Sequence, residues 1–93
     1  MAEETFAVEY GYVPDMERLR EPHRGDHLEF LRGLHQKGSL VLAGALTSPV
    51  DGGWIIVRAE SPAAARAMMD ADPYAAAGLI RSVTIRSIAI PSF

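Results

Sequence analysis

The stretch RGDHLEFLRGLHQKGSLVLAGAL, residues 24–46, decides the fold. Its first part repeats apolar residues at helical spacing, and on a helical wheel Leu31 and Leu34 flank His27 within about 40°. Gly38 then ends the helix, in the way that a glycine in a left-handed cap does. The residues that follow are apolar on both faces, which indicates a strand. A helix therefore leads directly into a strand.

The segments on either side of this stretch complete the pattern. The helix itself is expected to begin at Pro22 and to run to about Lys37. Three further strands are expected over residues 5–12, 54–59 and 80–90. A second helix is expected to begin after the cap Ser61 and to reach about Ala71, where Asp72-Pro73 breaks it.

The resulting order is βαββαβ, which predicts an α+β, ferredoxin-like fold with an antiparallel sheet. Residues 1–93 are expected to form a single domain. The two helices cover one face of the sheet, yet the strands 40–46 and 54–59 are apolar on both faces. The second face therefore needs a cover as well, and we expect a homodimer built around the sheets.

Composition excludes several classes of protein. The formal net charge is −3 with no basic run, so no nucleic acid is expected as a partner. The absence of cysteine excludes disulfides, thiolate nucleophiles and cysteine metal sites. No apolar run approaches the length of a membrane span, and no signal peptide is recognised, so no membrane partner and a cytoplasmic location are expected.

His27 is the candidate functional residue because it interrupts an apolar helix face. Such a group needs a partner, and it marks either a structural contact or a working site. Arg24, one turn earlier, could bind an anionic or phenolate oxygen, or could form a salt bridge with Asp72 or Glu21. His23 and His27 have the i, i+4 spacing of a metal site, but no third ligand is fixed, and no metal is predicted.

With these residues in place, the chain resembles the YciI (YCII-related) family. The resemblance rests on Arg24-Gly25-Asp26-His27-Leu28, on Gly38-Ser39-Leu40, and on the second block from Asp70 to Leu79, DADPYAAAGL. It implies a subunit of a dimeric α+β barrel, with His27 and Asp72 facing each other in a pocket beside the sheet. By motif position it places Arg24 and Tyr74 near that pair.

The resemblance also implies a chemistry. A carboxylate that accepts the Nδ1–H of a histidine orients the ring and raises the basicity of Nε2, which can then move protons. Some similar proteins are dehydrochlorinases of chlorinated hydroquinones, so we predict a small cofactor-independent lyase or isomerase acting on a small cyclic or phenolic substrate. His27 and Asp72 are the predicted catalytic residues.

Arg24, Tyr74 and Gly44 are the predicted substrate-binding residues. Tyr74 could instead be a core aromatic residue with a solvated hydroxyl, and Gly44 could permit close approach of a ligand or mark a bulge. Two alternatives to an enzyme stay open. The same pocket could hold a metabolite in a non-enzymatic binding or accessory protein, or the His27–Asp72 pair could serve only to join two helices.

Overall fold

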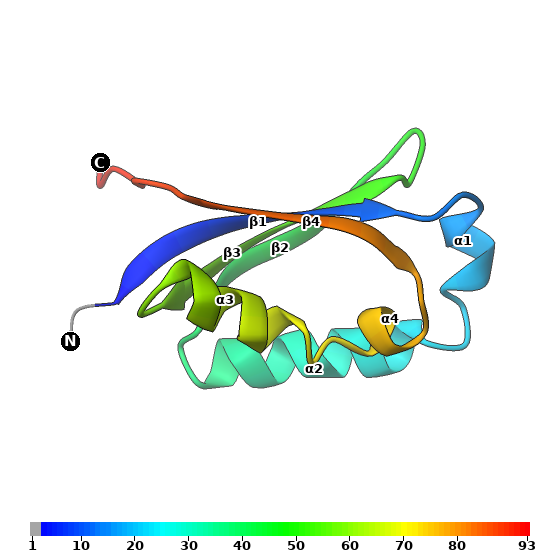
Figure 1. Ribbon diagram of the computed structural model, residues 1–93, viewed down its shortest axis with the longest axis horizontal. Helices are drawn as coiled ribbons and strands as arrows, with labels where there is room; N and C mark the ends of the chain where they lie inside the picture. The colour runs from blue at the N-terminus through cyan, green and yellow to red at the C-terminus, as the bar shows by residue number, and fades with distance from the viewer. Residues whose placement is uncertain (1–2) are drawn as a thin grey trace.

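A four-stranded antiparallel sheet forms one layer of the protein in the computed structural model, which describes residues 3–93 (Figure 1). The strands follow the order β2-β3-β1-β4 across the sheet, so the first and third strands of the chain lie in its centre. Their bounds are β1 (Glu4–Tyr12), β2 (Leu40–Leu46), β3 (Gly52–Ala59) and β4 (Ile80–Ser87).

Helices α2 (Arg24–Gln36), α3 (Pro62–Met69) and α4 (Pro73–Ala76) form the second layer, on one face of this sheet, and the short helix α1 (Met16–Leu19) lies beyond the end of the sheet (Figure 1). Helix α2 contacts β2 and α4, and α3 contacts β3 and β4. With α2 and α3 as the two crossing helices, the order is βαββαβ, so the expected α+β, ferredoxin-like fold is confirmed.

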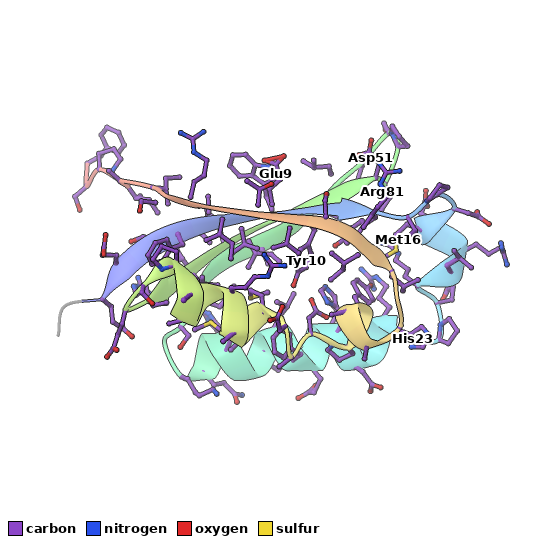
Figure 2. All side chains as sticks on the ribbon, viewed as in Figure 1. Glu9, Tyr10, Met16, His23, Asp51 and Arg81 are labelled. Carbon is purple, nitrogen blue, oxygen red and sulfur yellow. The ribbon has the colours of Figure 1, made fainter. Side chains whose placement is uncertain are left out.

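Alternation along β1 separates the core from the outer face. Phe6, Val8 and Tyr10 are at most 2% exposed and pack beneath the helices. Glu9 projects from the opposite face of the sheet, away from Tyr10 (Figure 2). This period of two is the pattern that the sequence predicts for the first strand.

Two predicted helix caps are present. Gly38 has φ +79, and the N–H of Ser39 reaches back to the carbonyl of Leu34 at 2.9 Å, which closes α2 as a Schellman motif. The Ser61 hydroxyl accepts the N–H of Ala64 at 3.0 Å and starts α3. These caps fix where each helix ends and therefore how it meets the sheet.

Four predicted boundaries were wrong, and the first of these is the start of β3, which lies at Gly52 rather than Trp54. Helix α2 begins at Arg24 rather than Pro22, because the N–H of His23 bonds the Arg20 carbonyl in a separate turn. Helix α3 ends at Met69 rather than near Ala71, because the chain turns there to place the next cap. Strand β4 ends at Ser87 rather than Ile90, although the N–H of Ile88 still bonds the Thr5 carbonyl.

The face of the sheet without helices carries large apolar side chains. Leu42, Leu46 and Trp54 are 52%, 45% and 44% exposed. Leu42 pairs with Ile56, and Trp54 lies between the positions that pair with Leu42 and Leu46, so these side chains form one apolar strip on β2 and β3. Within residues 3–93, none of the helices is long and apolar enough to cross a membrane.

Candidate functional site

The carboxylate of Asp72 is the centre of the candidate site. Asp72 is 1% exposed and caps α4, where its Oδ1 accepts the N–H of Tyr74 at 2.9 Å. Its Oδ2 accepts the hydroxyl of Tyr10 at 3.0 Å. The Asp-Pro sequence places the residue in an extended conformation before the helix, so the backbone holds the carboxylate in position.

His27 approaches this carboxylate from α2. Its Nδ1 lies 2.8 Å from Oδ1 and 3.0 Å from Oδ2 of Asp72. Because the carboxylate accepts from its other partners, Nδ1 carries the proton and donates. The imidazole also stacks on the ring of Tyr74, with the centroids 3.8 Å apart and the planes at 5°. The ring of His27 is therefore fixed in both position and tautomer.

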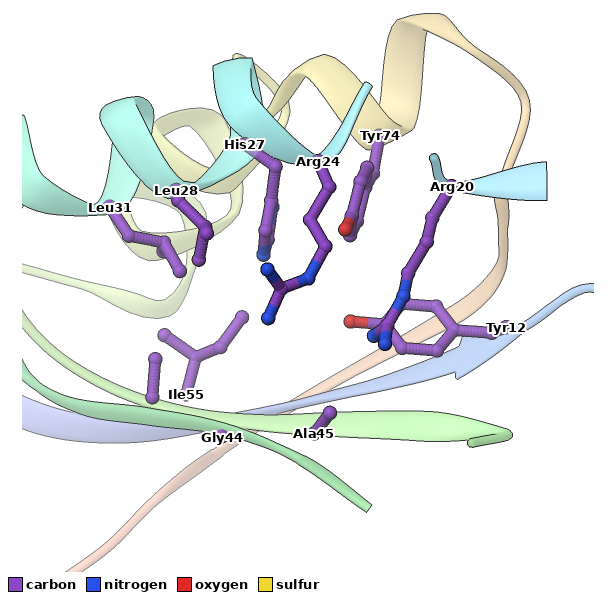
Figure 3. A pocket seen from close by; sticks show the side chains of 11 residues that line it. Tyr12, Arg20, Arg24, His27, Leu28, Leu31, Gly44, Ala45, Ile55 and Tyr74 are labelled. Atoms are coloured by element: carbon purple, nitrogen blue, oxygen red, sulfur yellow. The ribbon is translucent and has the colours of Figure 1, made fainter. Parts of the chain in front are cut away.

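The free nitrogen of His27 faces a pocket. His27 Nε2 makes no hydrogen bond within residues 3–93. Every buried side-chain nitrogen or oxygen of these residues has a hydrogen-bond partner, so Nε2 is not buried and is open to solvent. Figure 3 shows the tip of the ring pointing into the pocket. The pocket has a volume of about 200 Å³. A cavity of about 150 Å³ accepts benzene, so a single ring with a few substituents fits.

The pocket has an apolar end and a polar end (Figure 3). Leu28, Leu31 and Ile55 line the first, together with β2, whose residues Ala43, Gly44 and Ala45 form the floor. Tyr12, Arg20, Arg24 and Tyr74 line the second, with His27 between the two ends. A ligand that matches this lining has an apolar ring and polar substituents on one side.

The tyrosines of the site are held neutral by their surroundings. Burial raises the pKa of Tyr10 well above its usual range, and the charge of Asp72 and the hydrogen bond to it raise that pKa further. Burial also raises the pKa of Tyr12 to about 12. It raises the pKa of Tyr74 as well, while the charges of Arg20 and Arg24 oppose this rise. All three hydroxyls therefore act as hydrogen-bond donors at neutral pH.

Every residue predicted for the site lies at this pocket or directly behind it. Arg24 and Tyr74 line it, and Arg24 forms no salt bridge with any carboxylate of residues 3–93. Gly44 lines it too, but a Cβ built there would meet nothing within 4 Å, and the irregularity of β2 falls between Leu40 and Leu42 instead. Gly44 therefore neither marks the bulge nor relieves a close contact within the chain.

The spacing of His23 and His27 does not extend to a metal site in the structure. The part of the chain from residue 3 onward contains no group of three or more histidine, aspartate or glutamate side chains that could hold a metal ion. His27 already uses Nδ1 for Asp72. The structure thus brings His27 to a carboxylate and not to His23.

Three polar residues of the site were missed from the sequence. Tyr10 and Tyr12 lie on the face of β1 that packs in the core. Their hydroxyl groups distinguish them from Phe6 and Val8 on the same face, and this difference is the sequence feature that could have indicated them. Arg20 falls in a turn between α1 and α2 that carries no periodic pattern. The sequence feature that could have indicated Arg20 is its spacing of four residues from Arg24. This spacing places both side chains at one pocket only once the turn between them is known.

The sequence matches the YCII-related domain over residues 5–89, and the chain belongs to that family. The resemblance inferred from the two motif blocks is therefore confirmed. No curated protein matches the sequence.

Solved structures share the fold. The chain is similar to 5-chloro-2-hydroxyhydroquinone dehydrochlorinase (TftG) from Burkholderia phenoliruptrix AC1100, solved in complex with 2,5-dihydroxybenzoquinone, at 21% identity and a TM-score of 0.77, covering 88% of this chain and 90% of that one. It is similar to a candidate antibiotic biosynthesis monooxygenase from Bacteriodes thetaiotaomicron at 14% identity and a TM-score of 0.62, covering 98% and 93%.

A third similar structure is PA3566 from Pseudomonas aeruginosa, at 9% identity and a TM-score of 0.60, covering 99% of this chain and 97% of that one. At these identities the similarity defines the fold and leaves the reaction to the residues of the site.

Proposed function

We propose that the protein is a cofactor-independent lyase or isomerase that moves a proton on a small cyclic or phenolic substrate. The observation that carries this proposal is the geometry of His27: Nδ1 is engaged by Asp72, the ring is stacked on Tyr74, and Nε2 is open to the pocket. A histidine held in this way presents one basic nitrogen to a bound molecule. The dehydrochlorinase among the similar structures supports the choice of substrate class.

The proposed step balances without a redox partner. Nε2 of neutral His27 takes a proton from a ring carbon or a hydroxyl, and the electron pair of that bond moves into the ring. In a lyase reaction on a chlorinated hydroquinone, the imidazolium returns the proton to the ring carbon that carries chlorine, and removal of the proton of the second hydroxyl then expels chloride and leaves the quinone. In an isomerase reaction the imidazolium returns the proton to another ring position. Asp72 stabilises the imidazolium in both cases because its carboxylate accepts Nδ1–H.

The test is turnover of chlorinated hydroxyhydroquinones, measured by chloride release and by the absorbance of the quinone product. His27→Gln is expected to lower kcat by about 100-fold or more, since general acid–base catalysis contributes roughly that factor. His35→Gln is the matched control, because His35 is an exposed histidine of the same helix outside the pocket. Full turnover by His27→Gln would refute the catalytic role. Binding of the compounds without conversion by the wild type would favour the accessory-protein alternative.

We propose in addition that the protein acts as a homodimer joined through the open face of the sheet. Support comes from Leu42, Leu46 and Trp54, which are about half exposed on a face that no helix covers. An apolar strip of this kind in water favours association. Trp54→Lys is expected to shift sedimentation from dimer to monomer, whereas a wild-type monomer at micromolar concentration would contradict the proposal.

A further inference from the structure

Two arginines meet at the polar end of the pocket. Arg24 begins α2, and Arg20 lies in the turn that precedes it. Both side chains line the pocket, and in Figure 3 the guanidinium group of Arg24 turns toward the tip of the His27 ring while that of Arg20 overlaps the ring of Tyr12. Arg20 and Arg24 come from two adjacent segments of the chain, and both extend from the helical layer toward the sheet (Figure 3); we call this pair the arginine clamp.

Neither guanidinium has a carboxylate partner within residues 3–93. Other arginines of the chain do: Arg18, Arg32 and Arg66 each pair with an acid three or four residues away. Arg58, Arg81 and Arg86 form no salt bridge within the described residues, but Arg58 donates to the Gly38 carbonyl, Arg81 and Arg86 are exposed on β4, and none of the three lines this pocket. Arg20 and Arg24 thus both lack a carboxylate partner within the described residues, and both line the same pocket.

The wall of the pocket contains no acidic residue. The nearby carboxylate, Asp72, is buried and already accepts hydrogen bonds from Tyr10, His27 and Tyr74. The polar end is therefore positive, although the whole chain carries a formal net charge of −3. A positive cleft in an acidic protein attracts anions locally.

The guanidinium groups act on the phenols beside them. The charges of Arg20 and Arg24 oppose the rise in the pKa of Tyr74, and that of Arg20 opposes the rise in the pKa of Tyr12. A ligand oxygen placed between the same groups would be stabilised in its ionised form for the same reason. The hydroxyls of Tyr12 and Tyr74 add neutral donors at this end.

We propose that the ligand of this pocket carries a negatively charged oxygen substituent, and that Arg20 and Arg24 bind it together. The ring then lies toward Leu28, Leu31 and Ile55, within reach of His27. Arg20 is thereby assigned as a residue that determines specificity. The inference rests on the proposed function only for the identity of the pocket, since it requires binding and no chemical step.

Three ring compounds of similar size distinguish the two groups that could carry the negative charge of the ligand, an ionised ring oxygen and a carboxylate. The probe 2,5-dihydroxybenzoquinone supplies ionised ring oxygens, 2,5-dihydroxybenzoate supplies a carboxylate, and hydroquinone is neutral. Kd values are measured by titration calorimetry with the full chain at low and at physiological salt. At least one anionic probe is expected to bind more than about 10-fold tighter than hydroquinone, and the preferred anion identifies the source.

Substitutions locate the interaction. Arg20→Gln and Arg24→Gln are each expected to weaken binding of the preferred anion by about 10-fold or more, since each removes a hydrogen bond between charged groups. Arg18→Gln is the matched control, because Arg18 is exposed and paired with Asp15 outside the pocket; its Kd is expected to stay within about 2-fold. Circular dichroism confirms that the variants are folded.

The outcomes are distinct from those that test the reaction. His27→Gln is expected to retain anion binding while turnover is lost, so a failed reaction leaves the clamp intact. Equal binding of the anions and hydroquinone by the wild type would overturn the clamp. Unchanged anion affinity in either Arg20→Gln or Arg24→Gln would overturn it as well.

Discussion

Removal of the Tyr10 hydroxyl tests whether the Asp72 carboxylate is held as a buried charged acceptor. Tyr10 is 2% exposed and donates to Oδ2 of Asp72 at 3.0 Å. Tyr10→Phe deletes this donor and keeps the ring that packs in the core. The carboxylate then retains two donors, Nδ1 of His27 and the N–H of Tyr74.

The expected loss in the free energy of unfolding is about 2 kcal/mol, because a hydrogen bond to a charged group contributes roughly 1.5–3 kcal/mol. Tyr12→Phe is the matched control on the same strand. The Tyr12 hydroxyl lines the pocket and makes no hydrogen bond within residues 3–93. Its removal is expected to cost less than about 0.5 kcal/mol.

The assay is urea denaturation followed by circular dichroism, at one fixed protein concentration because association would shift the midpoint. With a slope of about 1–2 kcal/mol per molar urea, the loss in Tyr10→Phe corresponds to a midpoint lower by roughly 1–2 M. In an Asp72→Asn background the same substitution is expected to cost less, since the charged acceptor is gone. Equal losses for Tyr10→Phe and Tyr12→Phe would refute the reasoning.

Two further predictions concern the three site tyrosines and the glycines of β2 and β3. The pKa values of the three site tyrosines are raised in the folded protein, so the folded chain keeps protons that the unfolded chain releases near pH 10. Stability is therefore expected to be complete below about pH 10 and to fall as the pH rises toward 12, and urea midpoints that stay constant from pH 8 to 11 would contradict this. Gly52→Ala is expected to destabilise the protein by about 1–3 kcal/mol, because its Cβ would lie 2.7 Å from the backbone carbonyl oxygen of Tyr10. Gly44→Ala, which meets nothing within 4 Å, is expected to leave the urea midpoint equal or higher, and similar losses in both variants would argue against the crowding at Gly52.

Much of the fold was predictable because its signals are local. The alternation of Phe6, Val8 and Tyr10 and the glycine at position 38 each act within a few residues, and the structure contains both features. The ends of elements were less accurate. Helix α2 begins after the turn that contains Pro22, since the hydrogen bonds of that turn compete with the first helical turn.

The site was predictable to a smaller extent. His27 was evident as a polar interruption of an apolar helix face. Asp72 was assigned as its partner from the resemblance of the two motif blocks to the YCII-related family. Tyr10 could be assigned only to the core, because alternation gives the face of a side chain and not the partner of its hydroxyl. Arg20 could not be placed at all, since the turn that directs it depends on how α1 and α2 meet.

The three donors to Asp72 have a consequence for folding kinetics. They come from β1, α2 and α4, so Asp72 is bonded to residues 62 and 45 positions away in the sequence as well as to its own turn. Contacts of such separation form only after much chain entropy has been lost, so we expect them to form late in folding. If these contacts form late, weakening them is expected to raise the unfolding rate and to leave the folding rate nearly unchanged. The hydrogen bonds to Asp72 are therefore expected to determine the lifetime of the folded pocket.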